Sequence, residues 1–196
     1  MTGPPIVLWH GAHRWQAPPE VRPASPTTAE HGPGIYMTTS SETAREFAKG
    51  GGSLIRFELS PTLTLIEDVS VPLSDALDFV RSRSRLRRRR ELEADLERVA
   101  SRYRQGYIQR GTYQGGPLTL PAAVLVNLFV NYRSITGAHG PALAHFLVEH
   151  GADADVVPQG RDDWLVLFNP KKILNWRVVS YGQSEDAPRL RGRWQR

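Results

Sequence analysis

Residues 34–59, GIYMTTSSETAREFAKGGGSLIRFEL, predict a strand, a helix and a second strand in close succession. The opening GIYMT is apolar enough for a buried strand, and Ser40 or Ser41 offers the side-chain oxygen that caps a helix N-terminus. Three consecutive glycines at 50–52 end that helix. Residues 53–59 then alternate between the two sides of an extended chain, as a strand does.

The segments around this unit add further strands and helices. Residues 6–10, IVLWH, form a short apolar run before Gly11 and predict a strand. Later apolar runs predict helices at 73–105, 121–132 and 141–150, and strands at 63–67, 154–157, 164–168 and 173–180. The order lacks regular βαβ alternation, which favours an α+β fold. LWHGAH has neither the Rossmann nor the P-loop glycine spacing.

The composition excludes several classes of protein. The chain has 196 residues, 40% of them hydrophobic, and a formal net charge of +5. It contains no cysteine, so disulfides, cysteine nucleophiles and cysteine metal sites are excluded, and we expect no metal. No basic leader precedes an apolar run at the N-terminus, and no apolar window is long enough to span a bilayer. We therefore expect a cytoplasmic protein without a membrane partner.

Three short motifs hold the residue types of a catalytic site. They are Trp9-His10-Gly11 after the first strand, Tyr36 followed eleven residues later by Phe47, and Asp162-Asp163 before the apolar run WLVLF. Each motif alone has an ordinary structural explanation. A histidine at a strand end is commonly structural, aromatics in strands and helices are commonly core residues, and aspartate is frequent in turns.

Together, LWHG at 8–11, GPGIYMT at 32–38, a helix with an aromatic residue and an acid before a late strand resemble a known family. It is the diphtheria-toxin and poly-ADP-ribose-polymerase type of ADP-ribosyltransferase. The resemblance implies a split antiparallel β-sheet core with peripheral helices over residues 1–182. Residues 73–110 would then be an arginine-rich helical segment resembling an insert. Residues 183–196 are polar, which predicts a flexible tail.

The resemblance also implies an activity. The protein would cleave the nicotinamide–ribose bond of NAD⁺ and transfer one ADP-ribose to a protein or nucleic acid, as a bacterial or phage toxin or effector. His10 would bond the ribose beside adenine, and Gly11 would offer its backbone to the nicotinamide carboxamide. Tyr36 and Phe47 would cover the two faces of the nicotinamide ring. Asp163 would bond the other ribose and stabilise the transition state.

Two positions depart from the family pattern. Asp163 stands where the family usually has glutamate, and a shift of register would make Asp162 or Glu149 the acid instead. Ala44 stands where a serine often bonds the carboxamide, so Thr43 is the nearest hydroxyl that could replace it. The shorter acid favours transfer of a single ADP-ribose over polymerisation. It also leaves two alternatives open, an NAD⁺ glycohydrolase and a catalytically inactive module that binds nucleic acid or another partner.

The positive charge is concentrated in one part of the chain. Residues 81–110 carry a net charge of +7, whereas residues 1–80 carry −4 and residues 111–182 carry none. Arg81–Arg90 would contact the phosphates of a nucleic-acid acceptor. Alternatively, they would bind an acidic antitoxin or inhibitor protein. They would otherwise form a solvated helix, partly neutralised by the acids that follow, of which the first is Glu91.

Overall fold

The computed structural model describes residues 3–23, 30–83, 86–112, 115–180 and 190. By its contacts the chain divides into two compact units. Unit 1 comprises Met1–Val21, Gly34–Leu65 and Asp153–Arg196, and unit 2 comprises Arg22–Pro33 and Ile66–Ala152. The residues predicted as one domain, 1–182, are therefore shared between both units. The fold is a mixture of α and β structure, with antiparallel pairing in both sheets.

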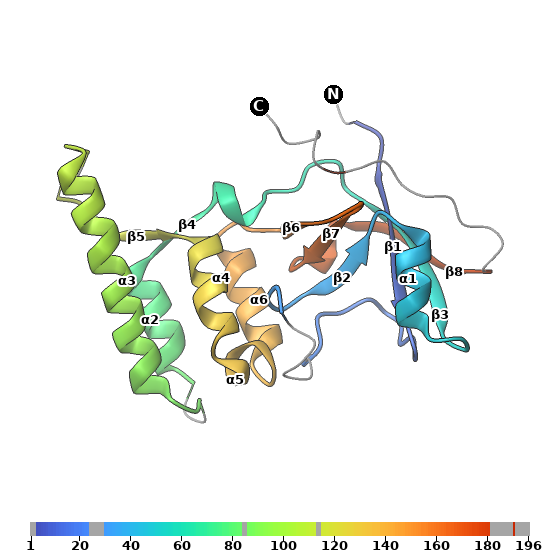
Figure 1. Ribbon diagram of the computed structural model, residues 1–196, viewed down its shortest axis with the longest axis horizontal. Coiled ribbons are helices and arrows are strands. Elements are labelled where there is room, and N and C mark those ends of the chain that lie inside the picture. Colours follow the sequence, from blue (N-terminus) through green and yellow to red (C-terminus); the bar gives the residue numbers. More distant parts are fainter. Residues whose placement is uncertain (1–2, 24–29, 84–85, 113–114, 181–189, 191–196) are drawn as a thin grey trace. The chain divides into compact units, whose positions relative to one another are not determined.

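The described residues of unit 1 form a six-stranded sheet and one α-helix, α1 (Ser41–Ala48). Along the sheet the strands follow the order β6-β7-β2-β1-β3-β8, and every neighbouring pair is antiparallel. Their bounds are β1 (Ile6–Ala12), β2 (Ile35–Thr38), β3 (Ser53–Leu59), β6 (Ala154–Gln159), β7 (Asp162–Leu167) and β8 (Ile173–Val179). A short 3₁₀ turn, η2 (Pro170–Lys172), precedes β8. Figure 1 shows α1 beside β1, β2 and β3.

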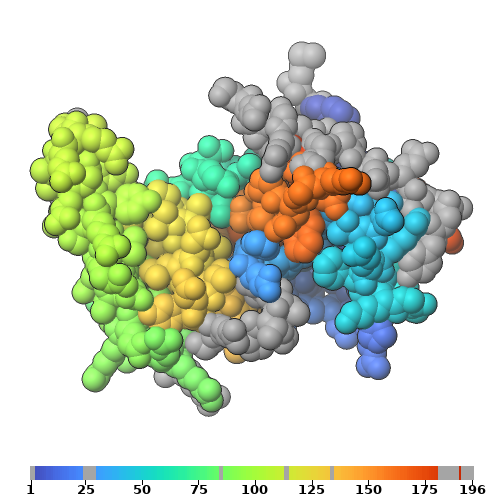
Figure 2. All heavy atoms as spheres, viewed as in Figure 1, coloured from blue at the N-terminus to red at the C-terminus, as the bar shows by residue number. Residues whose placement is uncertain are grey.

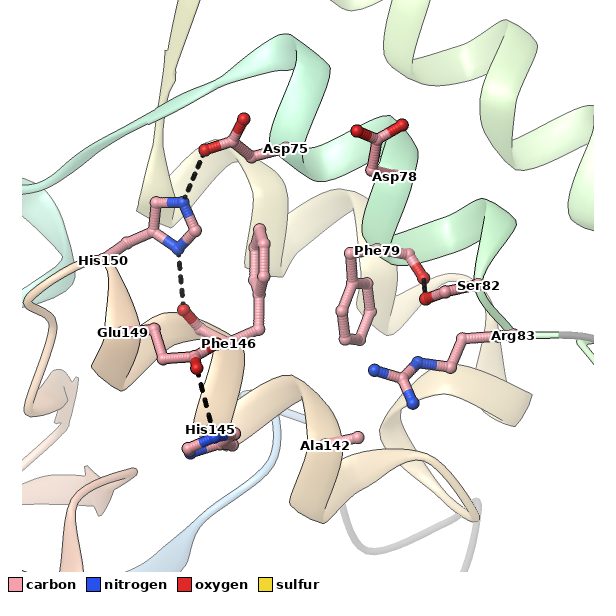
Figure 3. A pocket seen from close by; sticks show the side chains of 10 residues that line it. All are labelled: Asp75, Asp78, Phe79, Ser82, Arg83, Ala142, His145, Phe146, Glu149 and His150. Carbon is pink, nitrogen blue, oxygen red and sulfur yellow. Dashed lines mark hydrogen bonds and ion pairs between the residues drawn. The ribbon is translucent and has the colours of Figure 1, made fainter.

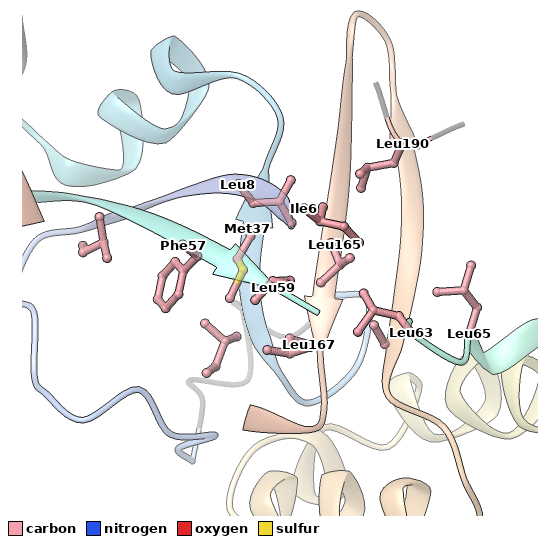
Figure 4. Packing of buried hydrophobic residues seen from close by; sticks show 13 residues of the cluster. Ile6, Leu8, Met37, Phe57, Leu59, Leu63, Leu65, Leu165, Leu167 and Leu190 are labelled. Atoms are coloured by element: carbon pink, nitrogen blue, oxygen red, sulfur yellow. The ribbon is translucent and has the colours of Figure 1, made fainter. Parts of the chain in front are cut away.

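The two faces of this sheet are covered differently. One face carries the main core cluster, which Figure 4 shows gathering aliphatic side chains from β1, β2, β3 and the β6–β7 hairpin. On the other face α1 packs Ala44 against Trp9 and Leu54. Ser40 caps the helix as the sequence predicts, because its side chain accepts a hydrogen bond from the Thr43 N–H at 3.2 Å.

Unit 2 is helical apart from a two-stranded sheet. Its elements are η1 (Ile66–Asp68), β4 (Ser70–Pro72), α2 (Leu73–Arg81), α3 (Arg89–Gln109), β5 (Thr119–Pro121), α4 (Ala122–Val130), α5 (Arg133–Thr136) and α6 (Gly140–Glu149). The face of α3 that carries Leu92, Leu96 and Ala100 is buried. The hydroxyl of buried Tyr132 donates to the Asp95 carboxylate at 2.6 Å, which fixes the chain after α4 to α3.

Two local predictions need correction, and two short strands were not predicted. Residues 63–67 form no strand, and Leu65 makes only an isolated bridge to Ala154 before η1 begins. The region 73–105 is two helices, because α2 ends at Arg81 and α3 begins only after Arg88, whose φ is 58°. One continuous helix there would stack arginines on successive turns, which is unfavourable. The sequence also gave no signal for β4 and β5.

Two further findings concern the membrane and the C-terminal region. No helix within the described ranges is long and apolar enough to cross a membrane. Of the predicted tail, 183–196, the structure describes Leu190 alone, and the rest lies outside the described residues. Leu190 is buried and belongs to the main core cluster of unit 1, so at this position the chain is packed against the sheet.

Candidate functional site

The sheet of unit 1 opens between β1 and β2. All seven residues of β1 pair with β3, and all four residues of β2 pair with β7. Between β1 and β2, however, the described residues form one pair, Trp9↔Thr38. His10–Ala12 and Ile35–Met37 therefore face each other without a continuing ladder. Backbone N–H and C=O groups that no longer pair across two strands need other partners, so this opening is a place where a ligand can bind.

His10 bridges the opening. Its Nδ1 lies 2.6 Å from the carbonyl oxygen of Tyr36. A carbonyl can only accept, so Nδ1 carries the proton and Nε2 of the neutral ring is an acceptor. Burial lowers the pKa of His10, and the bond to Tyr36 opposes that shift only in part. Within the described residues Nε2 has no hydrogen-bond partner, so it can accept one from a hydroxyl.

Aromatic rings hold the imidazole of His10 in place. The ring centroid of Trp15 lies 5.7 Å from that of His10, and the centroid of Phe57 lies 6.3 Å from it. Trp15 in turn packs edge-on against Trp176 of β8. Trp15 follows β1 in a loop, and we did not expect it to contribute, because a single tryptophan outside the predicted strands shows no periodicity.

Gly11 lies directly beneath the backbone of α1. A Cβ added at Gly11 would lie 1.6 Å from the carbonyl oxygen of Ala44 and 2.9 Å from the amide nitrogen of Ala48. The family resemblance assigns this glycine to a backbone contact with the nicotinamide carboxamide. In the structure the close approach is made by the helix, whose Ala44 and Ala48 are both buried. Ala44 therefore has a packing role at the position where we considered a carboxamide-binding hydroxyl.

Aromatic side chains gather on the α1 side of the sheet. Tyr36 pairs with Val166, and Thr38 pairs with both Trp9 and Trp164, so strand alternation places Tyr36 and Trp164 on that side. Phe47 of α1 packs edge-on against Trp164 with ring centroids 5.6 Å apart. Phe47 is nevertheless 51% exposed. Its exposed face is available for stacking on a flat ring.

The two candidate acids at the start of β7 point to opposite sides of the sheet. Asp162 is on the α1 side, where its carboxylate accepts a hydrogen bond from the Thr43 hydroxyl. Asp163 is on the side of the main core, together with Leu165 and Leu167. Strand alternation places His10 on that same side, because its neighbour Leu8 belongs to the same cluster.

Asp163 is closed off from solvent. Its side chain is fully buried, and its Oδ2 accepts a hydrogen bond from the backbone N–H of Leu190 at 2.7 Å. Its own backbone is fixed to Thr39, whose N–H donates to the Asp163 carbonyl at 3.0 Å and whose hydroxyl accepts from the Asp163 N–H at 3.1 Å. No local sequence pattern predicted the contact with Leu190, which lies 27 residues further along the chain.

The third candidate acid, Glu149, belongs to a different site. It lies on α6 in unit 2 and pairs with His145 at 3.3 Å. Both line a depression of about 530 Å³ between α2 and α6, which Figure 3 shows. There His150 lies 3.1 Å from the Asp75 carboxylate, and this bond lowers the pKa of Asp75. None of the other predicted site residues lines this depression.

Comparison of the chain with family models, curated proteins and solved structures gives no match. Within the described ranges, no group of three or more histidine, aspartate or glutamate side chains is placed to hold a metal ion. The residues of unit 1 and the sequence motifs that they carry are therefore the basis for a proposed function.

Proposed function

We propose that this protein is an NAD⁺-dependent mono-ADP-ribosyltransferase of the His-Tyr-acid type. The observation that carries the proposal is the strand order, in which β1, β2 and β7 are consecutive although they are far apart in sequence. His10, Tyr36 and the pair Asp162–Asp163 therefore lie on neighbouring strands. His10 and Tyr36 lie at the opening between β1 and β2, and the two acids begin β7 on the other side of the Trp9↔Thr38 pair, beside Thr39. The motifs LWHG and GPGIYMT support NAD⁺ as the substrate of these residues.

Each residue has a role in binding that its surroundings permit. The unprotonated Nε2 of His10 accepts a hydrogen bond from a ribose hydroxyl, because Nδ1 is committed to the Tyr36 carbonyl. The exposed ring of Phe47 and the ring of Tyr36, both on the α1 side, flank the nicotinamide. A flat cationic ring between aromatic faces gains dispersion and cation–π energy. Thr43, already bonded to Asp162, is the hydroxyl nearest to this slot on α1.

Cleavage breaks the bond between nicotinamide and C1′ of the ribose. The bonding electron pair leaves with nicotinamide, which becomes neutral, and positive charge develops on the ribose. A carboxylate beside that ribose stabilises the charge and accepts the proton that the attacking acceptor loses. A macromolecular acceptor then forms the new bond at C1′. If water attacks instead, the product is free ADP-ribose, which is the glycohydrolase alternative.

We assign the carboxylate to Asp163, which occupies the acid position of the motif and shares a side of the sheet with His10, although Tyr36 and Phe47 lie on the opposite side. Asp163 is fully buried and its Oδ2 accepts a hydrogen bond from the Leu190 N–H, so the chain at Leu190 has to move before a ribose hydroxyl can reach this carboxylate. Asp162 is the second candidate, because it lies partly exposed on the side of Tyr36 and Phe47. If Asp163 is the acid, a substitution that removes the Leu190 N–H should change the activity. If Asp162 is the acid, it should not.

The test is incubation with labelled NAD⁺ and cell lysate. We expect label in a macromolecule with the unchanged protein, and loss of label with Tyr36→Ala. With Asp163 as the acid, Asp163→Asn abolishes labelling and Asp162→Asn reduces it only in part. Leu190→Pro then increases labelling, because proline has no N–H to donate to Asp163. Leu190→Ala is the matched control, since it trims the side chain but keeps the N–H.

The outcomes separate the alternatives. Equal labelling by the unchanged protein and Tyr36→Ala would exclude the proposed transferase. Release of free ADP-ribose without a labelled macromolecule would identify a glycohydrolase. Loss of activity in Asp162→Asn, with Asp163→Asn still active, would move the acid to Asp162.

A further inference from the structure

The second half of α3 and the chain after it form a long stretch without acidic residues. Between Glu97 and Glu149 the sequence contains no aspartate or glutamate. The same stretch contains five arginines, Arg98, Arg102, Arg104, Arg110 and Arg133. A stretch that contains arginines and no acidic residues concentrates positive electrostatic potential where its side chains reach the surface.

In the first part of the arginine-rich segment, by contrast, several arginines are paired with nearby acids. Arg81 pairs with Glu93 at 3.4 Å, and Arg89 pairs with the same carboxylate at 3.5 Å. The guanidinium of Arg88 donates to Glu91 at 2.8 Å. Arg85 lies outside the described residues. Arg81–Arg90, the stretch that the sequence indicated for phosphate contact, therefore has several of its charges already paired.

The C-terminal half of α3 combines exposed arginines with aromatic rings. Tyr103 and Tyr107 are four residues apart on one side of the helix, with ring centroids 6.3 Å apart. The guanidinium of Arg110 lies over the Tyr107 ring, 5.8 Å from its centroid. Ile108 beside them is 56% exposed. Arg98 pairs with Asp95, whereas exposed Arg102 has no ion-pair partner within the described ranges.

The shape of unit 2 presents this half of the helix to solvent. Figure 1 shows the C-terminal end of α3 running past α2 and α4, and Figure 2 shows the same end as a projecting column. The buried side of α3 ends with Ala100, and Tyr103 and Tyr107 continue the same side as half-buried residues. The aromatic side of this helix end is thus left without a full packing partner in the described part of unit 2.

We propose that the C-terminal half of α3, residues 98–110, binds single-stranded nucleic acid. Arginines contact the phosphates, and the half-buried tyrosine rings stack on bases that are not already stacked in a duplex. An acidic protein would satisfy the arginines but would make little use of two tyrosines flanked by guanidinium groups. A lipid surface would need more aliphatic exposure than Ile108 provides. Binding of the strand does not depend on the proposed transferase activity. Only the use of the bound strand as the ADP-ribose acceptor rests on that proposed function.

The test is binding of fluorescein-labelled 20-nucleotide oligo(dT) and oligo(U), followed by anisotropy as a function of salt. The first variant is Arg102→Gln/Arg104→Gln/Arg110→Gln. Its matched control, Arg81→Gln/Arg88→Gln/Arg89→Gln, removes the same charge from three arginines that are paired with Glu91 or Glu93. We expect the first variant to weaken binding at least tenfold and to reduce the slope of log K against log salt by about 2, since each phosphate contact contributes roughly 0.7. The control should remain within about threefold.

A second variant separates stacking from charge. Tyr107→Ala leaves the net charge unchanged and should weaken binding of both oligonucleotides roughly tenfold, because it removes a stacking ring. The proposal is overturned if the two arginine triples weaken binding equally, or if Tyr107→Ala has no effect. Equally tight binding of a 20-base-pair duplex, or displacement of the strand by polyglutamate at equal charge concentration, would also overturn it. Circular dichroism and thermal unfolding confirm that each variant is folded. Labelling by NAD⁺ is not a readout here, so failure of the transferase proposal does not affect the result.

Discussion

Replacing Gly11 with alanine tests whether α1, rather than a ligand alone, requires a glycine at the end of β1. The added Cβ would lie 1.6 Å from the Ala44 carbonyl oxygen, whereas real Cβ atoms essentially never approach closer than 3.0 Å. The helix must therefore retreat from the sheet by about 1.4 Å. The contacting atoms belong to the helix backbone, so no rotation of a side chain can relieve the overlap.

The cost follows from the packing that this retreat disturbs. Overpacking in a tight interior typically costs about 1–3 kcal/mol. Here Ala44 and Ala48 also lose contact with the sheet, so we expect about 3 kcal/mol. For a chain of this size that lowers the unfolding temperature by about 6–12 °C. Differential scanning calorimetry and urea unfolding measure both quantities directly.

Gly51→Ala is the matched control. Its added Cβ would meet no atom within 4 Å, and its φ is not in the left-handed region. We expect its free energy of unfolding to stay within about 0.5 kcal/mol of the unchanged protein, the usual range for a surface substitution. A Gly11→Ala variant that unfolds within about 2 °C of the control would refute the placement of α1 on Gly11. The glycine would then have to be explained by a ligand.

Further expectations concern three buried polar groups. Burial and the Asp95 carboxylate raise the pKa of Tyr132 to about 12, so the stability that this contact provides is complete below pH 10 and lost between pH 10 and 12. Tyr132→Phe should lower the free energy of unfolding by about 1–2 kcal/mol, while Tyr107→Phe should not change it. Burial lowers the pKa of His10, so the unfolded chain binds its proton first and stability should fall as the pH drops through 6.5. Histidine NMR should show the neutral ring with a proton on Nδ1, and a charged ring at pH 6.5 would contradict this. Asp163→Asn should cost about 2 kcal/mol in urea unfolding, because it weakens the charge-assisted bond from Leu190. An unchanged unfolding midpoint would show that this bond contributes nothing.

Local sequence signals were sufficient where the chain organises itself over short distances. The strand–helix–strand at 34–59 was predicted because Ser40, the glycines at 50–52 and the alternation at 53–59 each act within a few residues. The division of 73–105 into α2 and α3 was missed, since helical periodicity continues on both sides of the arginine run. The short strands β4 and β5 were missed because three residues are too few for alternation to be visible.

In the candidate site, too, some features follow from neighbouring residues in the sequence and others only from contacts between distant segments. The sequence by itself determined the residue types, the N-cap of α1 and the positions of His10, Tyr36 and the two acids beside strands, because these depend on neighbours along the chain. Only the tertiary structure decided that β1 and β2 part after one pair and that Leu190 closes Asp163. These facts depend on atoms brought together from distant segments, and their balance of burial and hydrogen bonding has no counterpart in local sequence periodicity.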